Sequence, residues 1–180
     1  MGGPPVAPAD SATFQIQDES DMTVYGSSNV RDWSMDVNTM SGHAVFSTDE
    51  RGTPSIHQIT VEVPVKALVT DRSSMQEKAH KALQKEDHPT VQFTADSVVV
   101  ATAEADSFAV IATGDLTIAG ETRPATVRAK GAARGDGAYY VRGEHELKLS
   151  TFDVDRPSAL LGALRVSDGI RLAFEVVLRQ

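Results

Sequence analysis

Histidine is the side chain in this sequence best suited to metal binding or acid–base chemistry, because cysteine is absent. No two histidines form the H-x-H or H-x-x-x-H spacing that makes a zinc site specific. His57 and His145 share the alternation of their apolar neighbours, so both could face an interior and meet around a metal or a polar headgroup. We expect instead that each histidine is a hydrogen-bonded interior or rim residue, a group that comprises His43, His57, His80, His88 and His145.

Arginines near predicted turns are the other residues that could contact a charged ligand. If Arg31, Arg123, Arg156 and Arg165 cluster at one mouth of the fold, they could hold a lipid phosphate bidentately, although exposed arginine is ordinary on any surface. Enzyme signatures are missing: the sequence has no G-x-S-x-G elbow, Walker loop, dinucleotide fingerprint or H-E-x-x-H. We therefore predict no catalytic residue, no metal ligand and no enzymatic activity.

Charge and composition exclude several classes of protein. The formal net charge is −8 and no run of Lys or Arg forms a basic face, so nucleic acid is not an expected partner. No stretch is long and apolar enough to predict a transmembrane segment. Residues 1–12 are rich in Gly, Pro and Ala and lack the basic-then-apolar pattern of a signal peptide.

Most of the chain alternates between apolar and polar residues, which is typical of strands with one dry and one wet face. Trp33, Met35 and Val37 alternate in this way, and the later segments repeat the pattern. Turn-forming clusters at residues 49–52, 119–121, 134–137 and 167–169 separate the segments. The exception is 71–87, where helical spacing and a capping box, Ser73 with Gln76 or Ser74 with Glu77, predict one short helix.

Eight or nine amphipathic strands must hide both their apolar faces and their edges. A closed barrel and a two-sheet sandwich both achieve this, and strands of about ten residues favour the barrel. We therefore predict an all-β fold: an antiparallel barrel of about eight strands, with one helix between the strands near 56–68 and 90–100. Residues 1–12 are expected to form a flexible arm, and residues 13–180 a single domain.

Several segments in order along the chain resemble the YceI-like family of bacterial isoprenoid-binding proteins, whose fold is a lipocalin-like barrel. The resemblance spans roughly 13–178, and its most specific piece is the GDLTIAGETRP segment at 114–124. The other pieces are residues 26–33, 61–68, 85–93 and 151–154 with Pro157. Asp153 departs from the family, which commonly has glycine at that position.

The resemblance implies a hydrophobic lipid ligand such as a quinone tail or a polyprenyl chain, with no other cofactor. It also implies a periplasmic or secreted location, and that two chains can pair as a homodimer. The function expected on this basis is non-enzymatic transport or storage of the lipid inside the barrel. The alternative is a ligand-free interaction or stress-response module that acts through its surface.

The inward-facing rows are the candidate lipid-binding surface, and the same rows would equally form an ordinary packed core. Within them, an indole N–H needs a partner when it is buried, so Trp33 is expected near a barrel end or a polar neighbour. The candidate residues are Trp33, Met35, Val37, Phe46, Ile59, Val61, Val63, Phe93, Phe108, Val110, Leu116, Leu147, Phe152 and Phe174.

Overall fold

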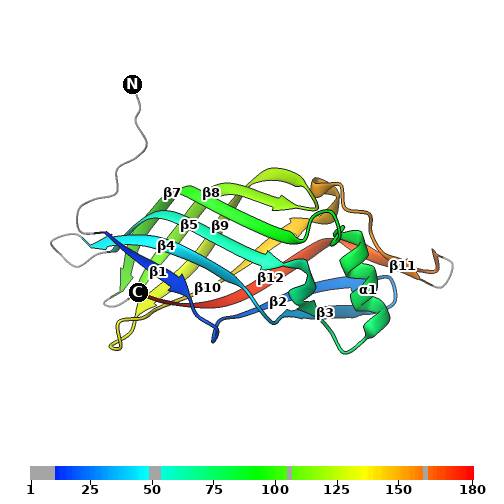
Figure 1. The fold of residues 1–180 in the computed structure, drawn as a ribbon, viewed down its shortest axis with the longest axis horizontal. Coiled ribbons are helices and arrows are strands. Elements are labelled where there is room, and N and C mark those ends of the chain that lie inside the picture. The colour runs from blue at the N-terminus through cyan, green and yellow to red at the C-terminus, as the bar shows by residue number, and fades with distance from the viewer. Residues whose placement is uncertain (1–10, 49–53, 105–106, 160–161) are drawn as a thin grey trace, which may run out of the picture.

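A computed structural model describes residues 11–48, 54–104, 107–159 and 162–180 of the chain. Most of it is strand (Figure 1). The strands are β1 (Ala12–Ile16), β2 (Asp21–Ser28), β3 (Asp32–Val37), β4 (Ser41–Thr48), β5 (Pro54–Pro64), β6 (Leu68–Val69), β7 (Thr90–Glu104), β8 (Ser107–Ile118), β9 (Glu121–Ala133), β10 (Tyr139–Lys148), β11 (Ser158–Ala159) and β12 (Leu164–Arg179). The helical elements are η1 (Val65–Ala67), α1 (Ser73–Ala82) and η2 (Leu149–Phe152).

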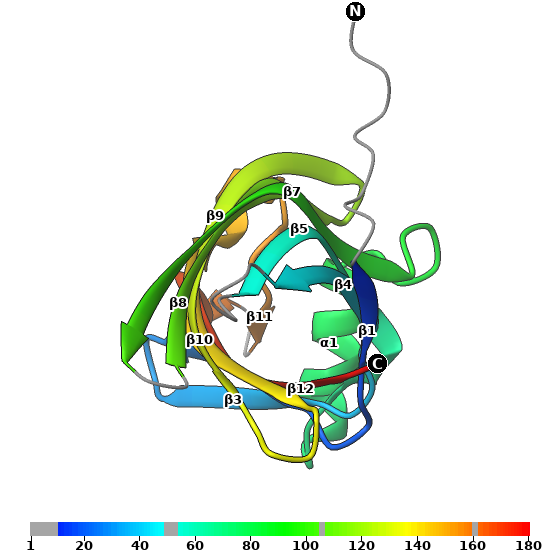
Figure 2. The same ribbon diagram turned by 90° about the vertical axis from the view of Figure 1, so that its left-hand side faces the viewer.

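The sheet closes on itself, as predicted. Within the described residues, eight antiparallel strands form the barrel, in the order β1-β4-β5-β7-β8-β9-β10-β12, and β1 pairs again with β12. Seen along the long axis, these strands make a ring (Figure 2). The remaining edge of β12 carries β2, which pairs with β3 and then β6, so the sheet extends at one end of the barrel.

The alternation read from the sequence sets which residues face inward. In β8, Phe108, Val110 and Ala112 are buried while the residues between them are less so. Their register partners on β9 face the same interior, because antiparallel partners lie on one face of the sheet. The expected all-β barrel with one helix is therefore confirmed.

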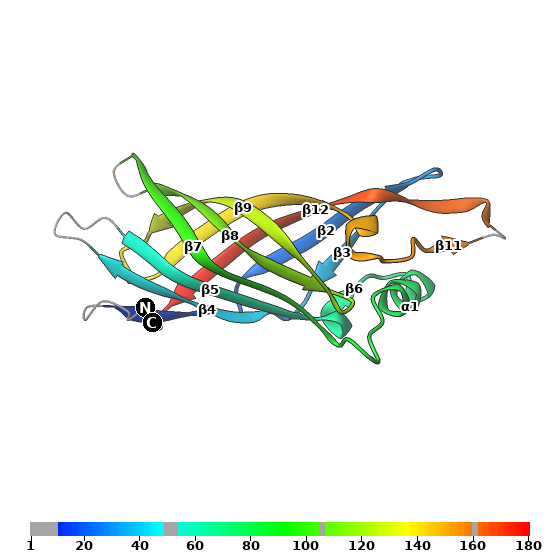
Figure 3. The same ribbon diagram turned by 90° about the horizontal axis from the view of Figure 1, so that it is seen from above.

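The helix α1 lies between β6 and β7, where it was expected, but its start differs from the prediction. Its N-cap is Arg72, which makes no side-chain cap hydrogen bond, so the expected capping box is wrong. Gln76 uses its side-chain oxygen to accept the backbone N–H of Thr70, before the helix. This contact ties the first turn of α1 to the end of β6. Figure 3 shows α1 and β11 together at one end of the barrel.

Two of the four predicted turns connect hairpins, and one does not. Ala119 and Gly120 both have positive φ between β8 and β9, as a two-residue hairpin requires. Residues 134–137 join β9 to β10. The expected turn at 167–169 is wrong: these residues lie inside β12, where the pairing with β2 shifts between Val166 and Ile170. A bulge of this kind uses turn-forming residues without ending the strand. The turn at 49–52, and most of the arm at 1–12, lie outside the described residues.

Aromatic rings fill the half of the barrel far from α1. Phe46 stacks on Tyr139 with ring centroids 4.6 Å apart, and Phe14 meets both rings edge-on. Phe108 adds a further edge contact to Tyr139. We call these four residues, Phe14, Phe46, Phe108 and Tyr139, the aromatic plug. Leu178 and Ile56 are buried with the plug, so this end of the interior is a packed core.

A candidate ligand cavity in the barrel

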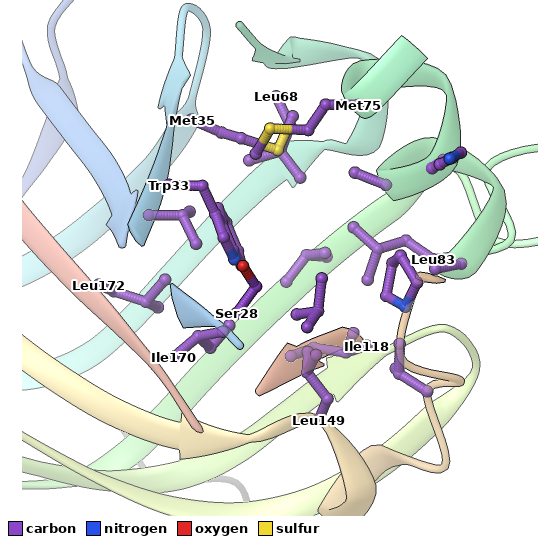
Figure 4. Close-up of a pocket in the computed structure, with 18 of the residues that line it drawn as sticks. Ser28, Trp33, Met35, Leu68, Met75, Leu83, Ile118, Leu149, Ile170 and Leu172 are labelled. Carbon is purple, nitrogen blue, oxygen red and sulfur yellow. The ribbon is translucent and has the colours of Figure 1, made fainter. Parts of the chain in front are cut away.

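An apolar cavity of about 420 Å³ occupies the half of the barrel beside α1. This volume lies within the range of about 300–1,000 Å³ usual for small-molecule sites. In Figure 4 the labelled side chains surround an open space, with Trp33 and Leu172 on one side and Leu83 on the other. The interior is therefore packed at one end and hollow at the other.

The helix supplies one wall of the cavity. Met75, Ala79 and Leu83 recur at intervals of four along α1 and its end, so they share one helix face, and all three line the cavity. The buried His80 turns the other way and donates a hydrogen bond to the Leu68 carbonyl oxygen at 2.7 Å. This bond helps to fix α1 against β6 with its apolar face toward the barrel.

Trp33 lies near the open end, as expected from its N–H group. Its Nε1 donates a hydrogen bond to the Ser27 carbonyl oxygen at 3.1 Å, and the ring lines the cavity. Gly26 is the register partner of Trp33, and a β-carbon built on Gly26 would lie 2.1 Å from the indole. A glycine at this position is what allows the ring to lie across β2.

The polar residues of the lining gather at the rim. Arg31, Arg72, Ser74 and Lys78 are exposed and also line the cavity, so the cavity reaches the surface at the α1 end. Among the described residues that line the cavity there is no Asp or Glu. The charged side chains that these residues bring to the rim are therefore all cationic, in a protein whose net charge is −8. We call Arg31, Arg72 and Lys78 the basic rim.

Six of the fourteen candidate residues line this cavity. They are Trp33, Met35, Val37, Val63, Leu116 and Leu147. The others pack elsewhere. Phe46 and Phe108 belong to the aromatic plug, and Val110 and Ile59 pack in the same cluster. Val61 packs against a buried cluster that contains Met35. Phe152 is buried in a second cluster together with Leu116 and Leu149, and Phe93 packs against that second cluster. Val110 and Phe174 border a second, more open hollow formed by β8, β9, β10 and β12.

Sequence reasoning missed much of the lining. The helical spacing over 71–87 predicts a helix, but it does not predict that Met75, Ala79 and Leu83 form a wall of the site. Helical periodicity shows that a face is apolar without showing which side of a barrel it covers. The other missed residues with apolar side chains include Met22, Val24, Leu68, Ile118, Leu149, Val154, Val166, Ile170 and Leu172.

The histidines differ in their partners. His57 shares a hydrogen bond with the Ser47 hydroxyl at 2.7 Å, in the bulged part of β5, and His80 is bonded to Leu68 as described. His145 faces the interior without a hydrogen-bonding partner among the described residues, so the expectation of a bonded histidine is wrong there. No group of three or more metal-ligating side chains occurs in the described ranges.

The predicted arginine cluster is only partly assembled. Arg31 belongs to the basic rim, whereas Arg123 lies 3.2 Å from Glu121 and 3.8 Å from Asp153. Arg165 donates from its Nε to the Gly162 carbonyl oxygen. The cations that reach the cavity besides Arg31 are Arg72 and Lys78, which were not predicted. In the part of the chain that the structure covers, no helix is long and apolar enough to cross a membrane.

A family model described as "YceI-like domain" matches residues 8–178 of the chain. No curated protein matches the sequence. The family match includes the strands of the barrel, apart from the last residue of β12, as well as α1, and so includes every described residue that lines the cavity.

Solved structures show the same fold. BcnA of Burkholderia cenocepacia is 19% identical, covers 88% of this chain and 96% of its own, and superposes with a TM-score of 0.67. A polyisoprenoid binding domain from Saccharophagus degradans is 10% identical, with coverages of 93% and 98% and a TM-score of 0.72. The YCEI protein of Campylobacter jejuni is 19% identical, with coverages of 79% and 82% and a TM-score of 0.60.

Proposed function

Because the chain belongs to the YceI-like family, we propose that it is a non-enzymatic protein that binds a long-chain isoprenoid lipid, of quinone or polyprenyl type, for transport or storage. The similarity to a structure described as a polyisoprenoid binding domain supports this ligand class. The cavity beside α1 is the binding site in this proposal, and the basic rim is its entrance.

The observation that carries the proposal is the hollow, apolar half of the barrel. A folded domain ordinarily packs its interior closely, because an empty space forfeits van der Waals contacts. Here Met35, Leu116 and Leu172 face a cavity that no side chain fills. An alkyl or isoprenoid chain entering it would gain about 0.8 kcal/mol for each buried methylene group. Affinity would then come mostly from apolar area.

The alternative is a ligand-free interaction or stress-response module, which would need an interior filled by its own side chains. The aromatic plug fits that description, since Phe46 and Phe108 are only 2% and 3% exposed. The half beside α1 does not, because it retains a cavity with a rim open to solvent. One end of the barrel interior is packed and the end beside α1 is hollow, and this combination supports a binding protein over a purely structural barrel.

We also propose that the protein works in the periplasm or outside the cell, on the strength of the family alone. A carrier for a lipid that is insoluble in water would be needed in an aqueous compartment between membranes. Fractionation of the cells from which the protein comes, with an antibody against the protein, tests this. Recovery in the cytosolic fraction would count against the location without affecting the binding proposal.

A thermal titration tests the binding proposal. A ligand that binds only the folded state raises the melting temperature by mass action. We expect Tm to rise as a short-chain prenyl quinone or prenyl alcohol is added to delipidated protein. The matched control is Ala79→Trp, which places a large ring in the cavity from α1. An unchanged Tm for the natural protein at saturating ligand would overturn the proposal.

A further inference from the structure

His145 faces the interior of the barrel next to the cavity: it is not itself a lining residue, but its neighbours Leu147 and Leu172 are. β10 pairs with β12 in unbroken register from Tyr139 to Lys148, so its odd-numbered residues share one face. On that face Tyr139 belongs to the aromatic plug, Val141 packs beside it, and Leu147 lines the cavity. His145 therefore faces inward, one step deeper than Leu147.

The surroundings of His145 are apolar. Its register partner is Leu172, which lines the cavity. One step further inward lies Gly143, where a β-carbon would meet the ring of Phe174 at 2.7 Å, so that ring covers the glycine. His145 thus lies between the apolar cavity on one side and the Phe174 ring on the other. It is half-buried.

The imidazole of His145 has no hydrogen bond or ion pair to any residue in the described part of the chain. His57 and His80, by contrast, are each bonded at 2.7 Å. Burial alone lowers the pKa of His145, with no charged neighbour contributing. A neutral imidazole has one donor and one acceptor nitrogen, and leaving both unpaired in an apolar site is unfavourable. No buried side-chain nitrogen or oxygen of the described residues lacks a partner, so the ring nitrogens of His145 retain accessible surface and a group from outside the chain can reach them.

We infer that His145 binds an uncharged, hydrogen-bonding headgroup, a carbonyl or a hydroxyl, of an isoprenoid ligand that enters the barrel head first. This inference rests on the proposed function and specifies the ligand within it. The headgroup lies between Leu172 and the Phe174 ring, and the hydrocarbon tail extends along the cavity toward the basic rim.

The chemistry of the site favours an uncharged headgroup over a phosphate. Placing a phosphate in an apolar interior requires cations or several donors to offset its lost hydration. One neutral imidazole offers a single donor, whereas a carbonyl or hydroxyl needs only one bond. A phosphorylated lipid would instead place its head at the basic rim, beside Arg31, Arg72 and Lys78, and would not contact His145. The two lipid classes therefore predict opposite orientations.

The test measures the binding of each of three ligands to the natural protein and to each of three variants. His145→Leu removes both hydrogen-bonding nitrogens and keeps an apolar interior residue, and His145→Gln restores a donor and an acceptor. His43→Leu is the matched control, because His43 lies on β4 with the opposite parity to the buried Ala44 and Phe46. The ligands are geranylgeraniol, its phosphate and the corresponding hydrocarbon without an oxygen, and the readout is Kd from quenching or shift of Trp33 fluorescence.

We expect His145→Leu to weaken geranylgeraniol binding about five- to tenfold, the loss of one hydrogen bond. Binding of the hydrocarbon and of the phosphate should stay the same, and His145→Gln should recover part of the loss. An equal loss for the alcohol and the hydrocarbon, or no loss for the alcohol, would overturn the inference while leaving the proposed function intact. If the natural protein binds none of the three ligands, the proposed function itself fails.

Discussion

The indole of Trp33 lies across Gly26, its register partner on β2, and donates to the carbonyl oxygen of Ser27 at 3.1 Å. The same relation recurs where Phe108 covers Gly131 and Phe174 covers Gly143, each ring beside the glycine opposite it in the sheet. In each of these three pairs, a large aromatic ring packs over the backbone of a glycine on the neighbouring strand. The one at the cavity end gives the protein a built-in optical probe, because Trp33 is its only tryptophan.

Trp33 should report ligand entry directly. A quinone that enters the cavity comes into contact with the indole and should quench its fluorescence, and an alkyl chain should shift the emission to shorter wavelength by excluding water. Titration with a prenyl quinone and with its headgroup alone, without the tail, checks this. Equal quenching by both at the same concentration would show collisional quenching in place of binding.

Gly26→Val should displace the indole. The added side chain begins 2.1 Å from the ring, so Trp33 must leave its position and the hydrogen bond to Ser27 is lost. We expect a loss of about 1–3 kcal/mol in the free energy of unfolding, as for other overpacked sites, with emission shifted to longer wavelength. Gly135→Ala is the control, because a β-carbon there meets nothing within 4 Å. Unchanged emission from a folded Gly26→Val protein would contradict the contact.

A bulky residue on the inner face of α1 should block the cavity. Ala79→Trp points into the site, whereas Lys81→Trp lies on the exposed side of the same helix. We expect Ala79→Trp to reduce isoprenoid affinity by tenfold or more, and Lys81→Trp to leave it unchanged. Urea unfolding of both variants shows whether the fold is kept. Full binding by a folded Ala79→Trp protein would place the ligand elsewhere.

Protonation of His145 should destabilise the protein at mildly acidic pH. Burial lowers the pKa of His145 in the folded state, so the unfolded chain binds the proton more tightly. This site leaves stability unaffected above the unfolded pKa of about 6.5 and lowers it as pH falls below that value. The pH dependence of the unfolding free energy should therefore become flatter between about pH 7 and 5 in His145→Leu. An unchanged pH dependence would contradict the burial of His145.

Asp153 should be replaceable by glycine without loss. It adopts φ 52° and ψ 32° after η2, a left-handed conformation in which residues with a β-carbon are strained. Its contact with Arg123, at 3.8 Å between exposed groups, adds little. We expect Asp153→Gly to keep or raise the stability and Asp153→Val to lower it by about 1–2 kcal/mol, measured by urea unfolding. The exposed Asp155→Val is the control, and equal losses at both sites would argue against backbone strain.

The alternation of apolar residues was sufficient to predict the barrel, because each strand must bury one face and the closed sheet removes the edges. Alternation could not show how the interior is divided. Phe46, Val110 and Leu116 occur in equivalent patterns, yet the first two pack at the aromatic plug and the third lines the cavity. Whether one end of the interior is packed or hollow depends on the sizes of side chains that come from distant strands and meet inside the barrel. No single segment of the sequence contains that information.

The bulge in β12 and the start of α1 escaped prediction for a related reason. Residues 167–169 have turn chemistry, but pairing of β12 with β2 on both sides keeps them within one strand. The side chain of Gln76 is used by Thr70 before the helix, so it cannot complete a capping box. In both places a tertiary contact overrides a local preference.

The central claim is that the hollow half of the barrel holds an isoprenoid lipid. Organic extraction and mass spectrometry of the protein, purified without detergent from bacterial cells, test this most directly. We predict one long-chain isoprenoid with an uncharged oxygenated headgroup, in near-stoichiometric amount, from the natural protein, and little or none from Ala79→Trp. Protein that carries no long-chain lipid, and takes none up from added membranes, would contradict the account.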